Sequence, residues 1–437
     1  MNEDDLPEGW RWAKLGDGLV VDIQPGFACG TNNRSGEGVP HLRPMNVTPE
    51  GRISLADLKS VPKSEVYKDE RWVRTGDILF NNTNSPELVG KTAYYDLPEP
   101  RAFSNHMTRL RTNSEHLDSR FCATFLHQLW RDGHFERICN NHVSQASISR
   151  NVLSDTSIPL PPVAEQKRIV AKVEELLASV NAARDRLARI PSILSRFRES
   201  VLLTACSGRL SADAPSEVPP TPLRNVGDLD LQDLPDIPDR WKYIRADCVI
   251  EPDTVITYGV VLPGRNVPDG VPYIRGLDIE SGQILSGQLW RMKAEIAEKH
   301  IRSSLKKGDV LLCIIRHLKV AVVPDGLDGA NLTQGTVRLR PSEHVLGRYL
   351  ATYLQSPQAQ EWMKHRYFGM DMPRINVRDA RALPIAVPPF QEQVQIVHRV
   401  DALFALARSI GERLTATSAR ADKLAQSILA RAFQGAL

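Results

Sequence analysis

The chain has 437 residues, of which 42% are hydrophobic and 24% charged, with a formal net charge of +3. This length predicts a globular protein with more than one hydrophobic core. The six cysteines include no CxxC pair and the eleven histidines no HxxxH pair, so the sequence indicates neither a disulfide framework nor a zinc site. The N-terminal sequence lacks the features of a signal peptide, and no apolar run of about 18 residues occurs, so we expect neither secretion nor a membrane span.

The first globular segment, residues 1–155, is expected to mix helices and strands. The run GDILF from Gly76 has the apolar character of a buried strand, and SRFCATFLHQLWR from Ser119 is typical of a helix. Between them lies the polar loop NNTNSPELVGK, which begins at Asn81. Basic residues number 18 and acidic residues 21 in this segment, a net charge of −3.

Residues 156–210 are predicted to form a long helical tail that opens with PPVAEQKRIV from Pro161. Apolar residues in it recur in alternating steps of four and three, which is the period of a coiled-coil seam. Pro191 removes a helical hydrogen bond and is expected to kink this helix. The predicted seam comprises Ile169, Val173, Leu176, Val180, Ala183, Leu187, Ile190, Leu194, Phe197 and Val201.

A linker is predicted over residues 211–236. This stretch is rich in proline and carries six acidic residues against one basic residue, a composition poorly suited to a packed core, so we expect an exposed connector.

The second globular segment, residues 237–382, repeats features of the first. IPDRWKY from Ile237 resembles LPEGWRW from Leu6, KGDVLL from Lys307 resembles TGDILF from Thr75, and TVRLR ending at Arg340 resembles MTRLR ending at Arg111. GDVLLCIIR is expected to be a strand, followed by RHLKV at the position of the first segment's polar loop, and GRYLATYLQSPQAQEWM from Gly347 to be a helix. This segment has 21 basic and 16 acidic residues, a net charge of +5.

The second tail, residues 383–437, aligns with the first without a gap at a constant offset of 227 residues. Glu165 and Gln166 fall on Glu392 and Gln393, and Gly208 falls on Gly435. The chain is therefore a tandem duplication of a globular domain plus a helical tail. Ser418 stands where the first tail has Pro191, so the second helix is expected to be unbroken. Its predicted seam comprises Ile396, Val400, Leu403, Ala407, Ile410, Leu414, Thr417, Ala421, Leu424 and Ile428.

The fold class predicted is α+β, with two globular domains and two long helices that pair as an antiparallel coiled coil. Two equivalent units in one chain tend to associate around a pseudo-two-fold axis, and helices that cross such an axis run antiparallel. Packing of each helix on its own globular domain is the alternative interpretation.

With this layout, the chain resembles the specificity subunit of type I restriction-modification enzymes over nearly its whole length. The resemblance rests on the paired openings PLPPVAEQKRIV and PPFQEQVQIV, and locally on GDILFNNTNSPELVGKTAYYD and GFACGTN, which are similar to segments of the family's recognition domains. It implies that each globular domain reads one half of a split sequence in double-stranded DNA. It also implies that the helices form a spacer, that two methyltransferase subunits dock beside them, and that restriction subunits complete the complex.

No catalytic motif was found in the chain. VPPF from Val387 has the outline of the (N/D)PP(Y/F) motif of adenine methylation, but valine cannot grip the target amino group. Neither a glycine-rich loop after a strand nor GxxxxGK(S/T) is present, so we expect the chain to bind no cofactor or metal. S-adenosylmethionine, ATP and Mg²⁺ are implied on the partner subunits, and a cytoplasmic location in a prokaryote is implied for the complex.

The candidate DNA-binding residues lie in the two equivalent polar segments, because Asn, Arg and Lys side chains read adenine and guanine edges in the major groove. An ordinary solvated turn is the alternative interpretation of each. Arg43 and Arg275 occupy equivalent positions in another repeated motif and are equally well explained as residues that hold the fold. The candidates are Asn81, Asn82, Thr83, Asn84, Lys91 and Arg43 in the first domain, and Arg275, Arg316, His317 and Lys319 in the second.

Three functions of different classes fit the sequence alone: a DNA-reading adaptor without catalysis, a two-headed scaffold for protein ligands, and a stand-alone enzyme. The missing catalytic motifs argue against the enzyme, and the resemblance favours the adaptor.

Overall fold

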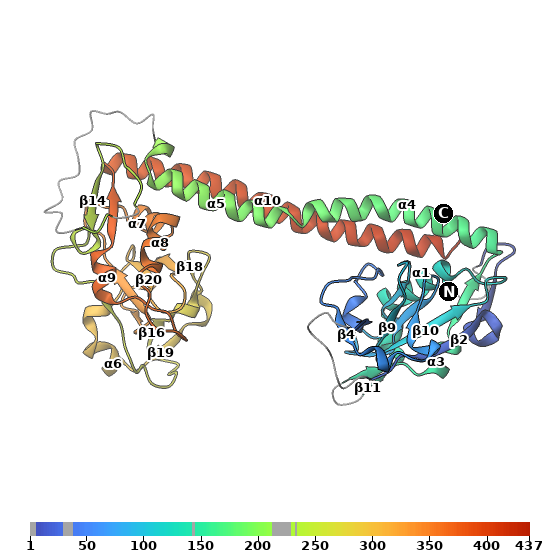
Figure 1. Ribbon diagram of the computed structural model, residues 1–437. Coiled ribbons are helices and arrows are strands. Elements are labelled where there is room, and N and C mark those ends of the chain that lie inside the picture. The colour runs from blue at the N-terminus through green and yellow to red at the C-terminus, as the bar shows by residue number, and fades with distance from the viewer. Residues whose placement is uncertain (1–5, 29–37, 142–144, 212–228, 232–233) are drawn as a thin grey trace. The chain divides into compact units, whose positions relative to one another are not determined.

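The computed structural model describes residues 6–28, 38–141, 145–211, 229–231 and 234–437. Most of the predicted linker, residues 211–236, and the second half of GFACGTN lie outside the described residues. The chain divides into two compact units, Met1–Ala188 with Thr415–Leu437, and Arg189–Leu414 (Figure 1). Each unit joins a globular part to helical segments, which confirms the predicted α+β class.

Two four-stranded sheets form the globular part of the first unit. One has the order β2-β10-β6-β8 and is antiparallel throughout, and the other has the order β4-β3-β9-β5, in which β3 and β9 are parallel. The central strand β6 is buried at every position, as GDILF predicted. The elements are β1 (Arg11–Lys14), β2 (Val20–Pro25), β3 (Val39–Leu42), β4 (Lys59–Val61), β5 (Trp72–Val73), β6 (Ile78–Asn81), β7 (Thr83–Asn84), β8 (Thr92–Tyr94), β9 (Arg101–Phe103), β10 (Met107–Thr112), α1 (Ser119–Arg131), α2 (His134–Ile138), β11 (Asn140–Asn141), β12 (Ala146–Ser147), α3 (Arg150–Ser154) and β13 (Ser157–Leu160).

The second unit repeats this topology. Its main sheet has the order β15-β23-β20-β21, and a second sheet, β19-β16-β22, again contains one parallel pair, β16 with β22. Strand β20 corresponds to β6 and is likewise fully buried. The elements are β14 (Lys242–Arg245), β15 (Thr257–Tyr258), β16 (Val271–Ile274), β17 (Ile279–Glu280), β18 (Gln283–Ile284), β19 (Trp290–Met292), α6 (Ala294–Lys299), β20 (Val310–Cys313), β21 (Val320–Val322), β22 (Asn331–Leu332), β23 (Thr336–Leu339), α7 (Gly347–Leu354), α8 (Pro357–Lys364), α9 (Val377–Ala382) and β24 (Pro384–Val387).

One predicted helix is two helices. The segment from Gly347 was expected to be continuous, but α7 ends at Leu354 and α8 begins at Pro357. The Ser356 hydroxyl accepts a hydrogen bond from the Ala359 N–H at 3.4 Å and caps α8. Proline at the first position of α8 lacks the N–H that would continue α7, so the sequence SP ends one helix and starts the next.

In each unit a two-stranded ribbon ties the start of the globular part to the strand before the helical tail. Strand β1 pairs with β13 and β14 pairs with β24 in the same antiparallel register, with Arg11 opposite Leu160 and Lys242 opposite Val387. The tails therefore leave both globular parts from equivalent points.

A buried glutamine at the start of each tail anchors it to the globular part. Gln166 donates to the carbonyl oxygens of Pro161 at 2.8 Å and His116 at 2.9 Å, and it accepts from the Asp118 N–H at 2.7 Å. Gln393 makes the same three bonds to Pro388, His344 and Leu346 at 3.0, 3.0 and 2.8 Å. The repeated glutamine is thus explained by an amide that satisfies three buried backbone groups.

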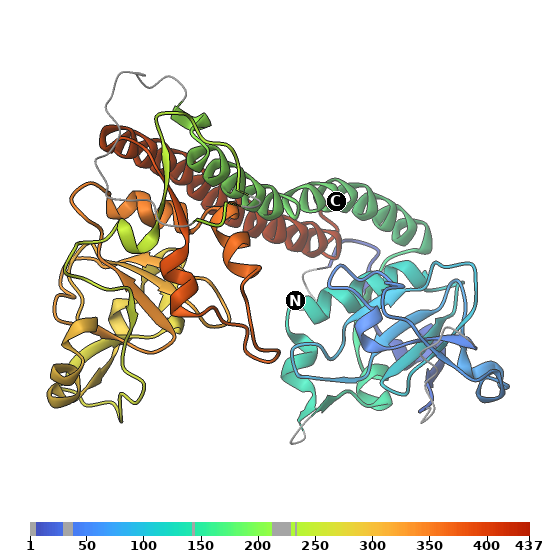
Figure 2. The same cartoon turned by 60° about the vertical axis from the view of Figure 1, so that its left-hand side comes forward.

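The tails form three helices, α4 (Val163–Leu187), α5 (Ile190–Cys206) and α10 (Phe390–Ala432). The break between α4 and α5 falls just before Pro191, which confirms the predicted disruption, whereas α10 runs unbroken for 43 residues, or about 64 Å at 1.5 Å per residue. Within the first unit, the C-terminal end of α10 lies beside α4 (Figures 1 and 2).

The helices pair antiparallel in both units. In the first unit Arg168 donates to the Leu437 carbonyl oxygen at 2.7 Å and Arg184 contacts Asp422 at 2.5 Å, so the chain runs backwards along α10 as it runs forwards along α4. In the second unit Arg399, near the start of α10, donates to the carbonyl oxygen of Leu210, beyond the end of α5. The predicted antiparallel coiled coil is confirmed.

The predicted seam is wrong at several positions. Most seam residues are buried or half-buried, but Ile410 is 38% and Leu424 is 54% exposed, and Thr417 and Ala183 are exposed as well. In α10 the half-buried or buried positions move to the next residue, namely Gly411, Ser418 and Ala425. The covered positions step by four residues twice in succession, from Leu403 to Ala407 and from Ala407 to Gly411, and then return to alternating steps of three and four. This is a stutter, an irregularity that a strict heptad pattern does not contain.

We predict that the two buried glutamines, Gln166 and Gln393, contribute equally to the free energy of unfolding of their units. Gln166→Leu and Gln393→Leu each leave one N–H and two carbonyl groups buried without partners, and each should lower the free energy of unfolding of its unit by about 3 kcal/mol or more. Urea unfolding followed by circular dichroism measures this loss.

The neighbouring Glu165 provides the control for this experiment. Glu165 forms a partly exposed pair with Arg168, so Glu165→Ala should cost less than about 1 kcal/mol. If Gln166→Leu cost no more than Glu165→Ala, the amide would not be the anchor of the tail.

Candidate nucleic-acid interface

One ion pair fixes the start of the central strand in both units. Asp77 accepts two bonds from the Arg111 guanidinium at 2.7 and 3.3 Å, and Asp309 accepts two from Arg340 at 2.7 Å. Each carboxylate also accepts a hydrogen bond from the backbone N–H three residues upstream. Arg74 donates to Asp77 and Lys306 donates to Asp309, both at 2.8 Å. The repeated GD and RLR motifs therefore hold β6 and β20 alike, so the segments that follow them are also equivalent.

The segment after the central strand is joined to a hairpin in both units. Strand β7 pairs with β12, and the Ile148 N–H donates to the Asn82 carbonyl oxygen at 2.9 Å. In the second unit the Ile375 N–H donates to the Ile314 carbonyl oxygen at 3.0 Å, and the Arg316 N–H donates to that of Pro373 at 2.7 Å. Asn84 and Arg316 therefore occupy equivalent positions.

Sequence reasoning missed these strand pairings, which join β11 to β12 in the first unit and Phe368 to Arg374 in the second. Each is too short and irregular to show a strand pattern. The signal was present in the repeat, since the offset of 227 residues places Ile148 on Ile375.

In the first unit the predicted DNA-binding residues differ widely in exposure. Asn81 and Lys91 are buried, and the Asn81 amide donates to the Pro44 carbonyl oxygen at 3.1 Å. Burial lowers the pKa of Lys91, and the charge of Glu50 opposes that shift. These two placements favour a structural role, because neither side chain reaches the surface.

The next three residues lie closer to the surface. Asn82 is half-buried and donates to the Asn105 carbonyl oxygen at 3.1 Å and to the Thr108 hydroxyl at 2.8 Å. Thr83 and Asn84 are half-buried on β7, and the Asn84 side-chain oxygen accepts from the Ser85 N–H at 2.9 Å. In both Asn82 and Asn84 part of the amide is therefore held by protein.

In the second unit the predicted residues are more accessible. Arg316 and His317 are exposed and Lys319 is half-buried. Arg316 has a φ of +65°, and among the described residues only Asp57 and Ser281 share a positive φ without being glycine. A left-handed arginine is strained, and strain of this kind gathers at functional positions.

Arg43 and Arg275 are held by local interactions. The Arg43 guanidinium donates to the Asp57 carbonyl oxygen at 2.6 Å. Arg275 forms a two-pronged pair with Asp278 at 2.8 and 2.9 Å and lies 4.7 Å from the centre of the Trp290 ring. Both placements favour the fold-holding interpretation that the sequence left open.

Comparison with known proteins decides the family. The model of the type I restriction modification DNA specificity domain matches residues 7–191 and 266–416. The specificity subunit of the type I restriction enzyme EcoBI of Escherichia coli is 31% identical, over 98% of this chain and 86% of that one. The EcoKI specificity subunit of Escherichia coli strain K12 is 26% identical, over 100% and 91%.

The chain belongs to the specificity subunits of type I restriction-modification enzymes. Its function is accordingly to recognise a DNA sequence within such a complex, and it is not itself the catalyst. The predicted adaptor, rather than the scaffold or the stand-alone enzyme, is confirmed.

Solved structures share the fold. A chain from a study of complex assembly and conformational transition of the type I R-M system matches with a TM-score of 0.71 at 22% identity, covering 99% of both chains. The HsdS subunit of Thermoanaerobacter tengcongensis matches with a TM-score of 0.56 at 21% identity, covering 99% and 98%.

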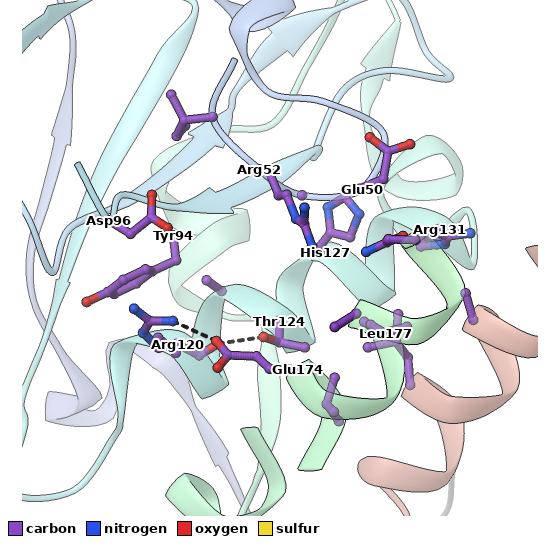
Figure 3. Close-up of a pocket in the computed structure, with 18 of the residues that line it drawn as sticks. Glu50, Arg52, Tyr94, Asp96, Arg120, Thr124, His127, Arg131, Glu174 and Leu177 are labelled. Carbon is purple, nitrogen blue, oxygen red and sulfur yellow. Dashed lines mark hydrogen bonds and ion pairs between the residues drawn. The ribbon is translucent and has the colours of Figure 1, made fainter. Parts of the chain in front are cut away.

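The specificity subunit has a cleft of about 620 Å³ in its first unit, between α1, α4 and the end of α10 (Figure 3). Charged side chains line it, and several are already paired: Arg120 with Glu174 at 2.6 Å, and Arg184 with Asp422 at 2.5 Å.

No group of three or more His, Cys, Asp or Glu in the described ranges is placed to hold a metal ion. Nor does any helix there have the length and apolar content to cross a membrane.

His127 borders this cleft but is buried. A ring nitrogen lies 3.1 Å from the Pro49 carbonyl oxygen, and burial lowers the pKa of His127 to about 4. Burial also lowers the pKa of His41 to about 4. Both histidines are therefore neutral in the folded first unit.

We predict that the first unit is acid-sensitive. The unfolded chain binds these two protons near pH 6.5 and the folded unit only near pH 4, so the free energy of unfolding should fall as the pH falls through this window. The loss should reach up to about 3 kcal/mol for each histidine. Urea unfolding between pH 7 and 4 measures the slope, and His127→Gln should make it shallower; an unchanged slope would exclude His127 as its source.

Proposed function

We propose that this specificity subunit reads a two-part, asymmetric DNA target, one half with each globular part. The observation that carries the proposal is that equivalent backbone positions in the two units bear different side chains. Asn84 and Arg316 occupy equivalent positions beside equivalent hairpins, and Thr83 corresponds to Ile315. An asparagine suits an adenine edge and an arginine a guanine edge, so the two halves should differ.

Charge supports a stronger DNA contact in the second globular part. Residues 237–382 carry a net charge of +5, whereas residues 1–155 carry −3. Phosphate contacts from Lys and Arg supply much of the affinity for DNA and are sensitive to salt. The first half-site should therefore depend more on phosphate contacts from partner subunits.

We further propose that two methyltransferase subunits, acting on adenine N6, dock along the helical segments and that restriction subunits join them. S-adenosylmethionine, ATP and Mg²⁺ would be bound by those partners, in the cytoplasm of a prokaryote. The length of α10 supports the spacer role. This one continuous helix packs at its start in the core of the second unit and at its end in the core of the first. An unread gap would separate the half-sites, whose centres would lie about one helical turn apart.

Arg316 offers a sharp test of the two-reader proposal. Arg316→Gly removes the guanidinium while suiting the positive φ, so it should relax the half-site read by the second unit without destabilising the protein. Asn84→Ala should relax only the other half-site. Each lost base contact is worth about 1–3 kcal/mol of discrimination.

The measurement is methylome sequencing of a host that carries each variant with its methyltransferase subunit. Ser281→Gly, a second positive φ in the same unit, is the matched backbone control and should leave the target unchanged. If Arg316→Gly and Asn84→Ala blurred the same bases, the division into two readers would be refuted.

A further inference from the structure

The hairpin of the second unit, Tyr367–Arg374, is built to present its tip rigidly. Phe368 and Arg374 exchange two backbone hydrogen bonds, at 2.9 and 3.0 Å. Gly369 has a φ of +89°, and a Cβ there would lie 2.9 Å from the Met372 carbonyl oxygen, so the turn is tight and requires glycine. The bonds from Ile375 and Arg316 described above fasten its base to the end of β20.

The tip of this hairpin is apolar and exposed. Met370 is 100% exposed, Met372 46% and Phe368 38%. Soluble proteins rarely gather apolar side chains on a projection unless the projection meets a partner. Since the hairpin is short and tied at its base, the tip cannot fold back to bury these side chains.

The surroundings of the tip are mainly cationic. The Arg374 guanidinium lies 4.8 Å from the centre of the Phe368 ring, and Arg316 and His317 are exposed beside the base of the hairpin. Asp371 is the carboxylate at the tip itself. An apolar point flanked by arginines fits a nucleic acid better than the apolar groove of a protein, because the arginines can contact phosphates while the point enters the base stack.

We propose that Met370 is a wedge that inserts between base pairs of the half-site read by the second unit. This inference rests on the proposed function and deepens it. A ligand that reaches Arg316 also meets the hairpin, since the two are joined through Pro373. Methionine is among the side chains that unstack a base step and kink the duplex.

The wedge adds a source of specificity that needs no hydrogen bond to a base. Pyrimidine–purine steps unstack most easily, so the target should contain such a step opposite Met370. The sequence at that position would be selected by deformability, whereas the bases beside it would be read by Arg316.

The test uses the complex of the full chain with its methyltransferase subunit and a duplex that carries the methylated target with 2-aminopurine placed at successive positions. With the native chain, fluorescence should rise several-fold at one step of the second half-site. Met370→Ala should abolish most of this rise and weaken binding about tenfold, whereas Met370→Leu should retain both. Ile301→Ala, which removes another exposed apolar side chain of the same unit, 72% exposed, should change neither.

Met370→Ala should fold normally, because the side chain contacts solvent only. An unchanged fluorescence rise with Met370→Ala would overturn the wedge. Loss of the methyltransferase subunit from the Met370→Ala variant on size-exclusion chromatography would also overturn it and assign the tip to a protein partner. Failure of the two-reader proposal would be distinguishable, since the native methylome would then show no separate second half-site.

Discussion

The docking of each tail's end onto the globular part of the other repeat is the constraint on which the rest of the structure depends. In the first unit, Phe433, the residue that follows α10, packs edge-on against Phe121 and Phe125, with ring centres 5.2 and 4.9 Å apart. Beyond it, Gly435 adopts a φ of +71° so close to Pro7 that a Cβ would lie 2.3 Å from the proline ring. Gly208 makes the same contact with Pro238 in the second unit, with a φ of +76° and a distance of 2.4 Å. Each core is therefore completed by residues from the opposite half of the sequence.

This exchange explains how one duplicated chain can carry two unlike readers. The helices, the glutamine anchors and the aspartate–arginine pairs are repeated because they form the frame and must fit one another. The segments after β6 and β20 take no part in that fit, so Asn84 in one unit can correspond to Arg316 in the other without disturbing the frame. The positions that hold the frame are thus separate from the exposed positions that differ between the two units.

The features that depend on local sequence pattern could be predicted from the sequence. The burial and exposure of individual side chains could not, because tertiary packing determines them. The duplication, the antiparallel helices and the break at Pro191 follow from spacing and backbone chemistry. One extra four-residue step, from Ala407 to Gly411, moved the seam past Ile410, which a strict heptad could not show. Asn81 was predicted at the DNA surface because it is polar, but it ends a central strand and lies in the core. The hairpin around Met370 has no periodic signal, and its apolar tip becomes informative only once its exposure is known.

Hydrogen exchange after removal of residues 433–437 tests the exchange of tails most directly. The account predicts that α1, which carries Phe121 and Phe125, loses protection in the first unit, while α7 in the second unit keeps its native exchange rate, because the core of that unit is completed by residues near Cys206. Equal loss of protection in α1 and α7, or no loss in either, would contradict the claim that each core is completed by the opposite repeat.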